Sequence, residues 1–131
     1  MILIDTSVVI DFWRKPSPEL AGAFSRPDLF ICGIVISELL YGARTPQELV
    51  TIERRAEGLK VVPIEERVWP AVGRNLQALR TAGLLVPFQD VVLATLAILN
   101  DAELWTSDLH FQQIQKVLTN LRLFSGPKTK S

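Results

Sequence analysis

Short apolar segments recur along the chain, separated by longer stretches in which apolar residues repeat with helical spacing. The apolar segments are rich in β-branched and aromatic residues, which is typical of buried strands. They lie at residues 1–4, 29–33, 60–64, 103–106 and 121–124. The last is expected to be an edge strand. No two of them are joined by a short turn signal, so the pattern contains no hairpin and predicts parallel strands with crossover connections.

Helical periodicity fills most of the segments between these strands. The predicted helices cover residues 7–13, 35–45, 46–58, 68–83, 90–99 and 108–117. Gly83 is a plausible end for the fourth helix, and the almost wholly apolar segment 91–99 is typical of a helix buried on most sides. Pro16 and Pro18 interrupt the first pattern, which predicts a loop after it.

The alternation of strands and helices predicts an α/β fold with a central parallel sheet covered on both faces. With 131 residues, of which 48% are hydrophobic, the chain can bury the core of one ordinary domain. The sequence shows no repeat, linker or second domain. We therefore expect one domain over residues 1–125 and a short polar tail over residues 126–131.

Charge and cysteine content narrow the class of protein. Fourteen basic and fourteen acidic residues cancel, so the total charge gives no broad attraction to nucleic acid or membrane, and a polyanion would be met locally. Cys32, the single cysteine, lies among apolar residues and is expected to be a small buried thiol. We expect a protein of the reducing cytoplasm. No apolar stretch approaches the roughly 18 residues of a membrane span, and neither secretion nor membrane insertion is predicted.

Acidic residues follow or lie near the ends of the predicted strands. Asp5 follows the first strand directly and Asp108 comes two residues after the fourth, while Glu38 and Asp90 lie near the beginnings of helices. In an open parallel sheet, ligands bind outside the carboxyl ends of the strands, where the strand order reverses. All four carboxylates are therefore candidates for one shared edge of the sheet.

Crowded carboxylates repel one another and lose hydration, and a divalent cation removes that conflict. Hard oxygen ligands suit Mg²⁺ or Mn²⁺, and such a site fits hydrolysis of a phosphodiester bond. Taken alone, Asp90 is better explained by a helix macrodipole and Asp108 by a helix N-cap. Glu38 is harder to explain in this way because it lies among apolar residues, with no basic residue before Arg44.

Four segments of the chain carry a family resemblance. They are IDTSV at 4–8, SELLYG at 37–42, DVVLA at 90–94 and TSDLHF at 106–111. Together, and in this order, they resemble the PIN-domain ribonucleases, specifically the VapC toxins of toxin-antitoxin modules. The resemblance extends over nearly the whole chain, and although each segment alone is a weak signal, the four together are specific.

The resemblance implies a three-layer α/β/α PIN-like fold with a central parallel sheet of about four to five strands. It also implies an endoribonuclease that depends on Mg²⁺ or Mn²⁺, forms a homodimer and is inhibited by a small VapB-type antitoxin inserted near the active site. By matching position, Asp5, Glu38, Asp90 and Asp108 are the catalytic acids. Asp5, Asp90 and Asp108 are the expected metal ligands.

Hydroxyl groups and one histidine complete the candidate site. Thr6, Ser7 and Thr106 match hydroxyl positions that orient the acids or a metal-bound water in the family, although local turn and capping bonds would explain them equally well. His110 stands where many relatives carry a further acid, which leaves open whether three or four acids bind metal. It could position a phosphate, donate a proton, or be an ordinary polar residue of its helix.

Direct contacts with RNA would have to come from individual basic residues. Arg44, about one and a half helical turns beyond Glu38, is the one whose place near the acids follows from the sequence, and we predict it as a substrate contact. Asp11 is expected to cap or pair locally. The sequence does not identify which RNA is cut.

Three alternatives to a ribonuclease toxin stay open. The chain could be a PIN-like nuclease outside any toxin-antitoxin module, or a PIN-like binding module without turnover. It could also be a phosphate-accepting domain in which Asp5 or Asp90 is the nucleophile. That last class needs a lysine placed after a strand, whereas Lys60 begins one.

Overall fold

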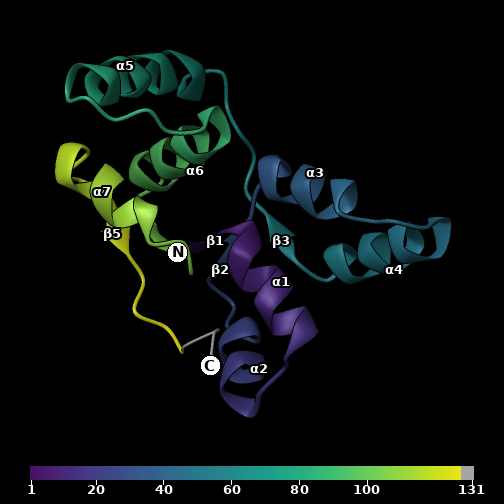
Figure 1. Cartoon of the computed structure of the whole chain (residues 1–131). Helices are drawn as coiled ribbons and strands as arrows, with labels where there is room; N and C mark the ends of the chain where they lie inside the picture. Colours follow the sequence, from purple (N-terminus) through teal and green to yellow (C-terminus); the bar gives the residue numbers. More distant parts are fainter. Residues whose placement is uncertain (128–131) are drawn as a thin grey trace.

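Residues 1–127 form a five-stranded sheet with helices packed around it in the computed structural model (Figure 1). The strands are β1 (Ile2–Ile4), β2 (Leu29–Ile31), β3 (Lys60–Val61), β4 (Glu103–Trp105) and β5 (Arg122–Leu123). The helices are α1 (Thr6–Arg14), α2 (Pro18–Phe24), α3 (Gly33–Tyr41), α4 (Pro46–Glu57), α5 (Val68–Thr81), α6 (Phe88–Leu99) and α7 (His110–Val117). Each predicted strand segment contains a strand, which confirms the predicted alternation.

The sheet is parallel throughout and its strand order is β3-β2-β1-β4-β5. The chain therefore builds outward from β1 through β2 to β3, and then returns to the other side of β1 to add β4 and β5. Leu3 of β1 lies opposite Phe30 on one side and Leu104 on the other. The point where the strand order reverses lies between β1 and β4, so the carboxyl ends of these two strands are the expected place for a ligand.

Helices lie in two groups with the strands between them, as Figure 1 shows. In one group α5 packs against α6 and α7, and in the other α1 packs against α3, which packs against α4. This confirms the predicted α/β architecture with a central parallel sheet flanked by helices. Among residues 1–127, no helix combines the length and the apolar character that crossing a membrane would require.

The core is built from the central strands and α6. Every residue of β1 is at most 1% exposed, and the residues of α6 from Val91 to Ala97 are all buried, which confirms the prediction for this helix. Burying side chains of this kind contributes roughly 1.5–3 kcal/mol each. Asp90, in the first turn of α6, is therefore attached to one of the most firmly packed elements of the fold.

The predicted loop after Pro16 is wrong, because α2 begins at Pro18. Proline is favourable at the first helical position, where its missing N–H costs nothing. The hydroxyl of Ser17 accepts a hydrogen bond from the Leu20 N–H at 3.1 Å, and Leu20 is buried. The capping serine and this buried leucine outweigh the interrupting effect that the two prolines suggest in isolation.

Other boundaries also differ from the prediction; for example, the helix predicted over residues 35–45 spans Gly33–Tyr41. The helix predicted to begin at Asp108 begins at His110. The third strand ends at Val61 rather than at residue 64, because Pro63 has no N–H for the ladder. The division into a domain of residues 1–125 and a tail of residues 126–131 stays a prediction, and residues 128–131 lie outside the described residues.

Candidate active site

Asp5 lies directly after β1, at the N-cap position of α1, with only 7% of its surface exposed. Its backbone N–H donates to the Trp105 carbonyl at 2.9 Å, which fixes it beside the end of β4. Its Oδ2 accepts hydrogen bonds from the Ser7 hydroxyl at 2.8 Å and from the Thr106 hydroxyl at 2.7 Å. Two short bonds of this kind compensate a carboxylate for its lost hydration.

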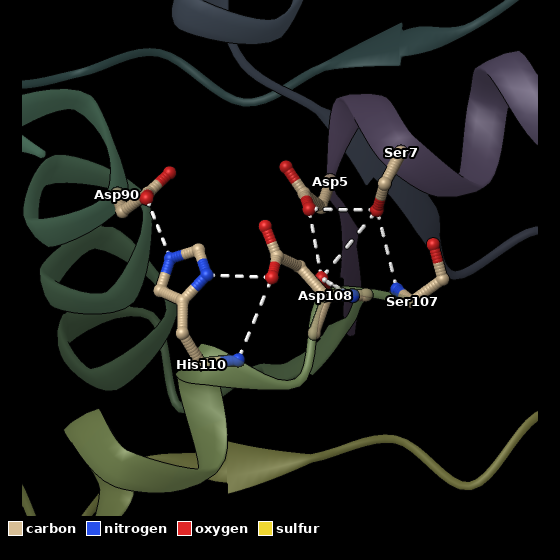
Figure 2. Close-up of polar contacts among 7 residues, drawn as sticks. Asp5, Ser7, Asp90, Ser107, Asp108 and His110 are labelled. Carbon is tan, nitrogen blue, oxygen red and sulfur yellow. Dashed lines mark hydrogen bonds and ion pairs between the residues drawn. The ribbon is translucent and has the colours of Figure 1, made fainter.

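The hydroxyls that contact Asp5 also organise the loop after β4 (Figure 2). Thr106 Oγ1 accepts from the backbone N–H of Asp108 at 2.9 Å, and Ser7 Oγ accepts from the backbone N–H of Ser107 at 3.2 Å. Each hydroxyl thus donates to Asp5 and accepts from the loop that carries Asp108. The segment after β1 and the segment after β4 are tied together by these side chains.

Asp11 is not confined to local capping, contrary to the prediction. Its Oδ2 accepts a hydrogen bond from the Ser107 hydroxyl at 3.1 Å, across 96 positions of sequence. The reason is that α1 runs beside the loop after β4, which the helical pattern alone does not indicate. Asp11 therefore supports the placement of that loop.

Glu38 lies on α3, part-buried, and its Oε1 accepts a hydrogen bond from the Thr6 hydroxyl at 3.0 Å. Burial raises the pKa of this carboxyl, and the charges of Asp5 and Asp90 raise it further, although the bond from Thr6 opposes the change. The structure therefore brings Glu38 within electrostatic reach of two of the other predicted acids.

Asp90 lies in the first turn of α6, where its backbone N–H donates to the Pro87 carbonyl at 3.1 Å. Burial raises the pKa of its carboxyl, contact with His110 lowers it, and the charges of Asp5 and Asp108 raise it. The helix N-terminus alone does not account for this residue, because its carboxylate faces other acids rather than only the backbone of its own helix.

His110 connects the two remaining acids, as Figure 2 shows. Its Nδ1 lies 2.6 Å from Asp108 Oδ1 and its Nε2 lies 2.7 Å from Asp90 Oδ2. Burial lowers the pKa of the imidazole, but the hydrogen bonds and charges of the two carboxylates outweigh it, so the pKa is raised overall. The sequence left the role of His110 open, and this double contact is a feature that sequence reasoning missed.

The chemistry of these donors suits a hard divalent cation, since carboxylate oxygens are the ligands that Mg²⁺ and Mn²⁺ prefer. Figure 2 shows the second oxygen of Asp5, of Asp90 and of Asp108 directed toward the space between the three side chains. Within residues 1–127, however, no three acidic, histidine or cysteine side chains stand close enough together to form a finished metal site. The residues fit a cation by type, and they need a local adjustment to hold one.

An open cleft of about 790 Å³ adjoins Asp108, the one candidate acid in its lining. It runs between the loop after β4 and the segment after β5, and its lining includes Ser7, Trp105, Thr106, Asp108, Leu109 and Phe124. The lining combines hydroxyl and carboxylate groups with aromatic and aliphatic surface. A space of this size, bordering Thr106 and Asp108, can receive part of a polar chain molecule.

Arg44 lies just after α3 and is exposed, with its backbone N–H donating to Glu48 Oε2 at 2.7 Å. Its predicted role as a substrate contact stays a prediction. Lys60 lies at the start of β3, where its Nζ donates to the Pro27 carbonyl at 2.7 Å. This contact places Lys60 near the ends of the strands opposite to Asp5, so Lys60 is not in position to serve a phosphate-accepting site at Asp5.

Comparison with known proteins gives one family match. Residues 2–117 match the model of the PIN domain family. Two curated proteins are similar over most of their length. "Ribonuclease VapC1" of Methanocaldococcus jannaschii is 27% identical over 116 residues, 88% of this chain and 82% of that protein. "Ribonuclease VapC11" of Mycobacterium tuberculosis is 29% identical over 133 aligned residues, 95% of this chain and 98% of that protein.

Solved structures share the fold. The VapBC2 structure from Rickettsia felis, bound to a DNA fragment from its promoter, contains a chain that matches with a TM-score of 0.80 and 22% identity, covering 95% of this chain and 98% of that one. A chain of the VapBC-1 structure from nontypeable Haemophilus influenzae matches with a TM-score of 0.78 and 22% identity, covering 95% of this chain and 97% of that one. At these identities the likeness concerns the fold.

Proposed function

Because the chain belongs to the PIN domain family, we propose that it is an endoribonuclease that hydrolyses phosphodiester bonds of RNA and requires Mg²⁺ or Mn²⁺. The observation that carries the proposal is that four carboxylates from separate segments lie within electrostatic reach of one another or of a shared neighbour in the set, beside the carboxyl ends of β1 and β4. Their charges act on one another: Asp5 and Asp108 raise the pKa of Asp90, and Asp5 and Asp90 raise the pKa of Glu38, beyond the effect of burial.

The biological role proposed is that of a toxin held inactive by a VapB-type antitoxin. Curated proteins similar to this chain are named as VapC ribonucleases, and the solved structures with its fold include VapBC pairs and a toxin-antitoxin complex from Klebsiella pneumoniae. A homodimer in the cytoplasm, with the antitoxin covering the acids, is part of the same proposal.

In the proposed mechanism Asp5, Asp90 and Asp108 hold the divalent cation, whose charge, when bound, would neutralise the phosphate and activate water for attack. Ser7 and Thr106 keep Asp5 Oδ2 in place by donating hydrogen bonds to it. Thr6 orients Glu38 through Oε1, which leaves Oε2 to accept a proton from the attacking water. The cleft beside Thr106 and Asp108 receives the RNA strand. In-line attack by water leaves a 5′-phosphate and a 3′-hydroxyl.

The decisive experiment replaces Asp5 by Asn and measures cleavage of a fluorescent RNA with Mn²⁺ and with EDTA. Asp5→Asn keeps the shape of the side chain but removes its charge, so we expect cleavage to fall at least about 100-fold while the circular dichroism spectrum is unchanged. Asp28→Asn is the matched control, because Asp28 is an exposed acid paired with Arg26. Undiminished cleavage by Asp5→Asn, or full activity in EDTA, would refute the proposal.

A further inference from the structure

The cleft beside Asp108 has walls from two segments that are distant in the sequence. One wall is the loop after β4, which includes Asp108 and Leu109, and the other is the segment after β5, which begins with Phe124. The cleft volume of about 790 Å³ lies within the range of ligand pockets, roughly 300–1,000 Å³. The space is therefore large enough for one part of a bound chain molecule.

Asp108 connects this cleft to the other acids. Figure 2 shows Asp108 between Asp90 on one side and Ser7 and Ser107 on the other. The two serines line the cleft, whereas Asp90 does not. Under the proposed function the cleaved phosphate lies beside Asp108, so the cleft receives the sugar and base of an adjoining nucleotide.

Leu109 and Phe124 supply apolar surface to opposite walls. Leu109 follows Asp108 directly, and its side chain is 74% exposed. A single exposed leucine is ordinary on a protein surface. This one, however, borders a cleft whose other wall carries an aromatic ring, and stacking on such rings is a usual way for proteins to bind RNA bases.

The ring of Phe124 is held firmly in its wall. It packs edge-on against Trp105 with ring centroids 5.3 Å apart, and the Arg26 guanidinium lies 5.5 Å from its centroid. A Cβ at Gly126 would lie 2.5 Å from Phe124 Cε2 and 2.9 Å from Trp105 Cε2, so the backbone after β5 packs directly on both rings and only glycine fits. A surface that is already ordered loses little entropy when it binds a ligand.

The charge of the lining suits a base better than a phosphate. None of the described residues in the lining is basic, and Asp108 is the one acid among them. A phosphate placed deep in the cleft would meet no positive charge there. An uncharged flat base would meet apolar surface and hydroxyl groups.

We propose that the cleft is a subsite for one nucleobase of the RNA, and that the base next to the cleaved phosphate packs between Leu109 and Phe124. This inference rests on the proposed ribonuclease function. Stacking accepts any base, because each has a flat π-face. The subsite therefore positions the strand against Asp108 and does not select a sequence.

The first test locates the base by removing it. The wild type cleaves a single-stranded fluorescent RNA in Mn²⁺, and the position of the cut is determined. In a series of the same RNA, one nucleotide at a time carries a ribose without its base. Loss of the base on one side of the cut should raise KM about 5–150-fold, with a smaller effect on kcat because the acids are untouched. Loss of a base about three or more nucleotides away is the matched control and should change KM little.

The second test asks whether that base lies on Leu109. Leu109→Ala should raise KM for the intact RNA roughly fivefold or more, because it removes apolar surface that the base covers. With the RNA that lacks the sensitive base, Leu109→Ala and the wild type should have equal KM, since the partner of the leucine is already missing. Leu109→Phe keeps an apolar side chain and should stay close to the wild type. Leu85→Ala, at a 91% exposed leucine outside the cleft lining, is the control.

A purely structural role of Leu109 would give a different result, because Leu109→Ala would then impair cleavage equally with and without the base. That result, or a wild type for which no base removal beside the cut raises KM, would overturn the inference and leave the proposed function standing. Undiminished cleavage of the intact RNA by Leu109→Ala would also overturn it and would leave the leucine to a protein partner. If the wild type cleaves no RNA in Mn²⁺, the proposed function fails and the inference fails with it.

Discussion

Replacing Thr106 by Val tests whether one hydroxyl organises both sides of the site. Thr106 Oγ1 donates to Asp5 Oδ2 at 2.7 Å and accepts from the Asp108 backbone N–H at 2.9 Å. Valine has nearly the same shape, so the substitution removes these two bonds and opens no cavity. Asp5 keeps its bond from Ser7, while the freed backbone N–H of exposed Asp108 can be hydrated.

The expected loss of stability follows from the two hydrogen-bond partners of Thr106, the Asp5 carboxylate and the Asp108 backbone N–H. A hydrogen bond to a buried charged group contributes about 1.5–3 kcal/mol, and the bond to a solvent-accessible N–H contributes less. We therefore expect Thr106→Val to lower the free energy of unfolding by about 2 kcal/mol. For a chain of this size, that corresponds to a Tm lower by about 6–10 °C. Loss of an orienting partner of Asp5, which we propose to bind the metal, should also lower RNA cleavage about 10–100-fold.

The assay combines urea unfolding, followed by circular dichroism, with cleavage of a fluorescent RNA in Mn²⁺. Thr106→Ser keeps the hydroxyl and should stay close to the wild type in both measurements. Thr119→Val, at an exposed threonine, controls for the general effect of the substitution. If Thr106→Val were as stable and as active as the wild type, Thr106 would have no role in holding Asp5, and the reasoning would be refuted.

Three further predictions concern the rest of the molecule. Asn75→Ala removes the donor to the buried Thr95 hydroxyl, a 2.9 Å bond between α5 and α6, and should cost about 1–3 kcal/mol in urea unfolding. Leu104→Ala, at a fully buried position of β4, should cost about 2–5 kcal/mol in the same assay, whereas exposed Leu109→Ala should change stability little. Cys32 is fully buried and burial raises the pKa of its thiol, so a thiol reagent should modify it roughly 100-fold more slowly in the native protein than in urea.

Each of these three predictions has an experimental outcome that would contradict it. Adding Thr95→Val to Asn75→Ala should restore part of the lost stability, and no recovery would mean that the unpaired hydroxyl was not the cause. Equal costs for Leu104→Ala and Leu109→Ala would contradict the burial of β4. Modification of Cys32 at the same rate with and without urea would contradict the burial of its thiol.

The strands were predictable because their local composition and their tertiary environment agree. Ile2–Ile4 is apolar, contains two β-branched residues and lies in the middle of the sheet, so its local preference for a strand and its buried position agree. The missed helix α2 shows the opposite case. Two neighbouring prolines usually indicate a loop. Here the capping serine and the proline at the first helical position instead begin a helix.

That the acids lie near one another could be predicted from the strand topology more than from the composition. Asp5 and Asp108 come after adjacent parallel strands, so the position of each in the sequence already places it at the same edge. The contact of His110 with Asp90 could not be derived in this way, since it depends on the angle at which α6 and α7 pack. The sequence offered only the spacing of Asp108 and His110 at the start of a helix, and that spacing does not indicate that His110 also contacts Asp90. The same holds for the bond from Ser107 to Asp11.

The pairing of β1 with β4 has a consequence for the synthesis of the protein. Asp5 leaves the ribosome well before Thr106, because the Thr106 hydroxyl that holds it is separated from it by 101 positions of sequence. Until β4 has emerged and docked beside β1, a nascent chain carries only some of the acids and none of the loop that completes their arrangement. Most of the message is therefore translated before the nascent chain can form the complete arrangement of acids.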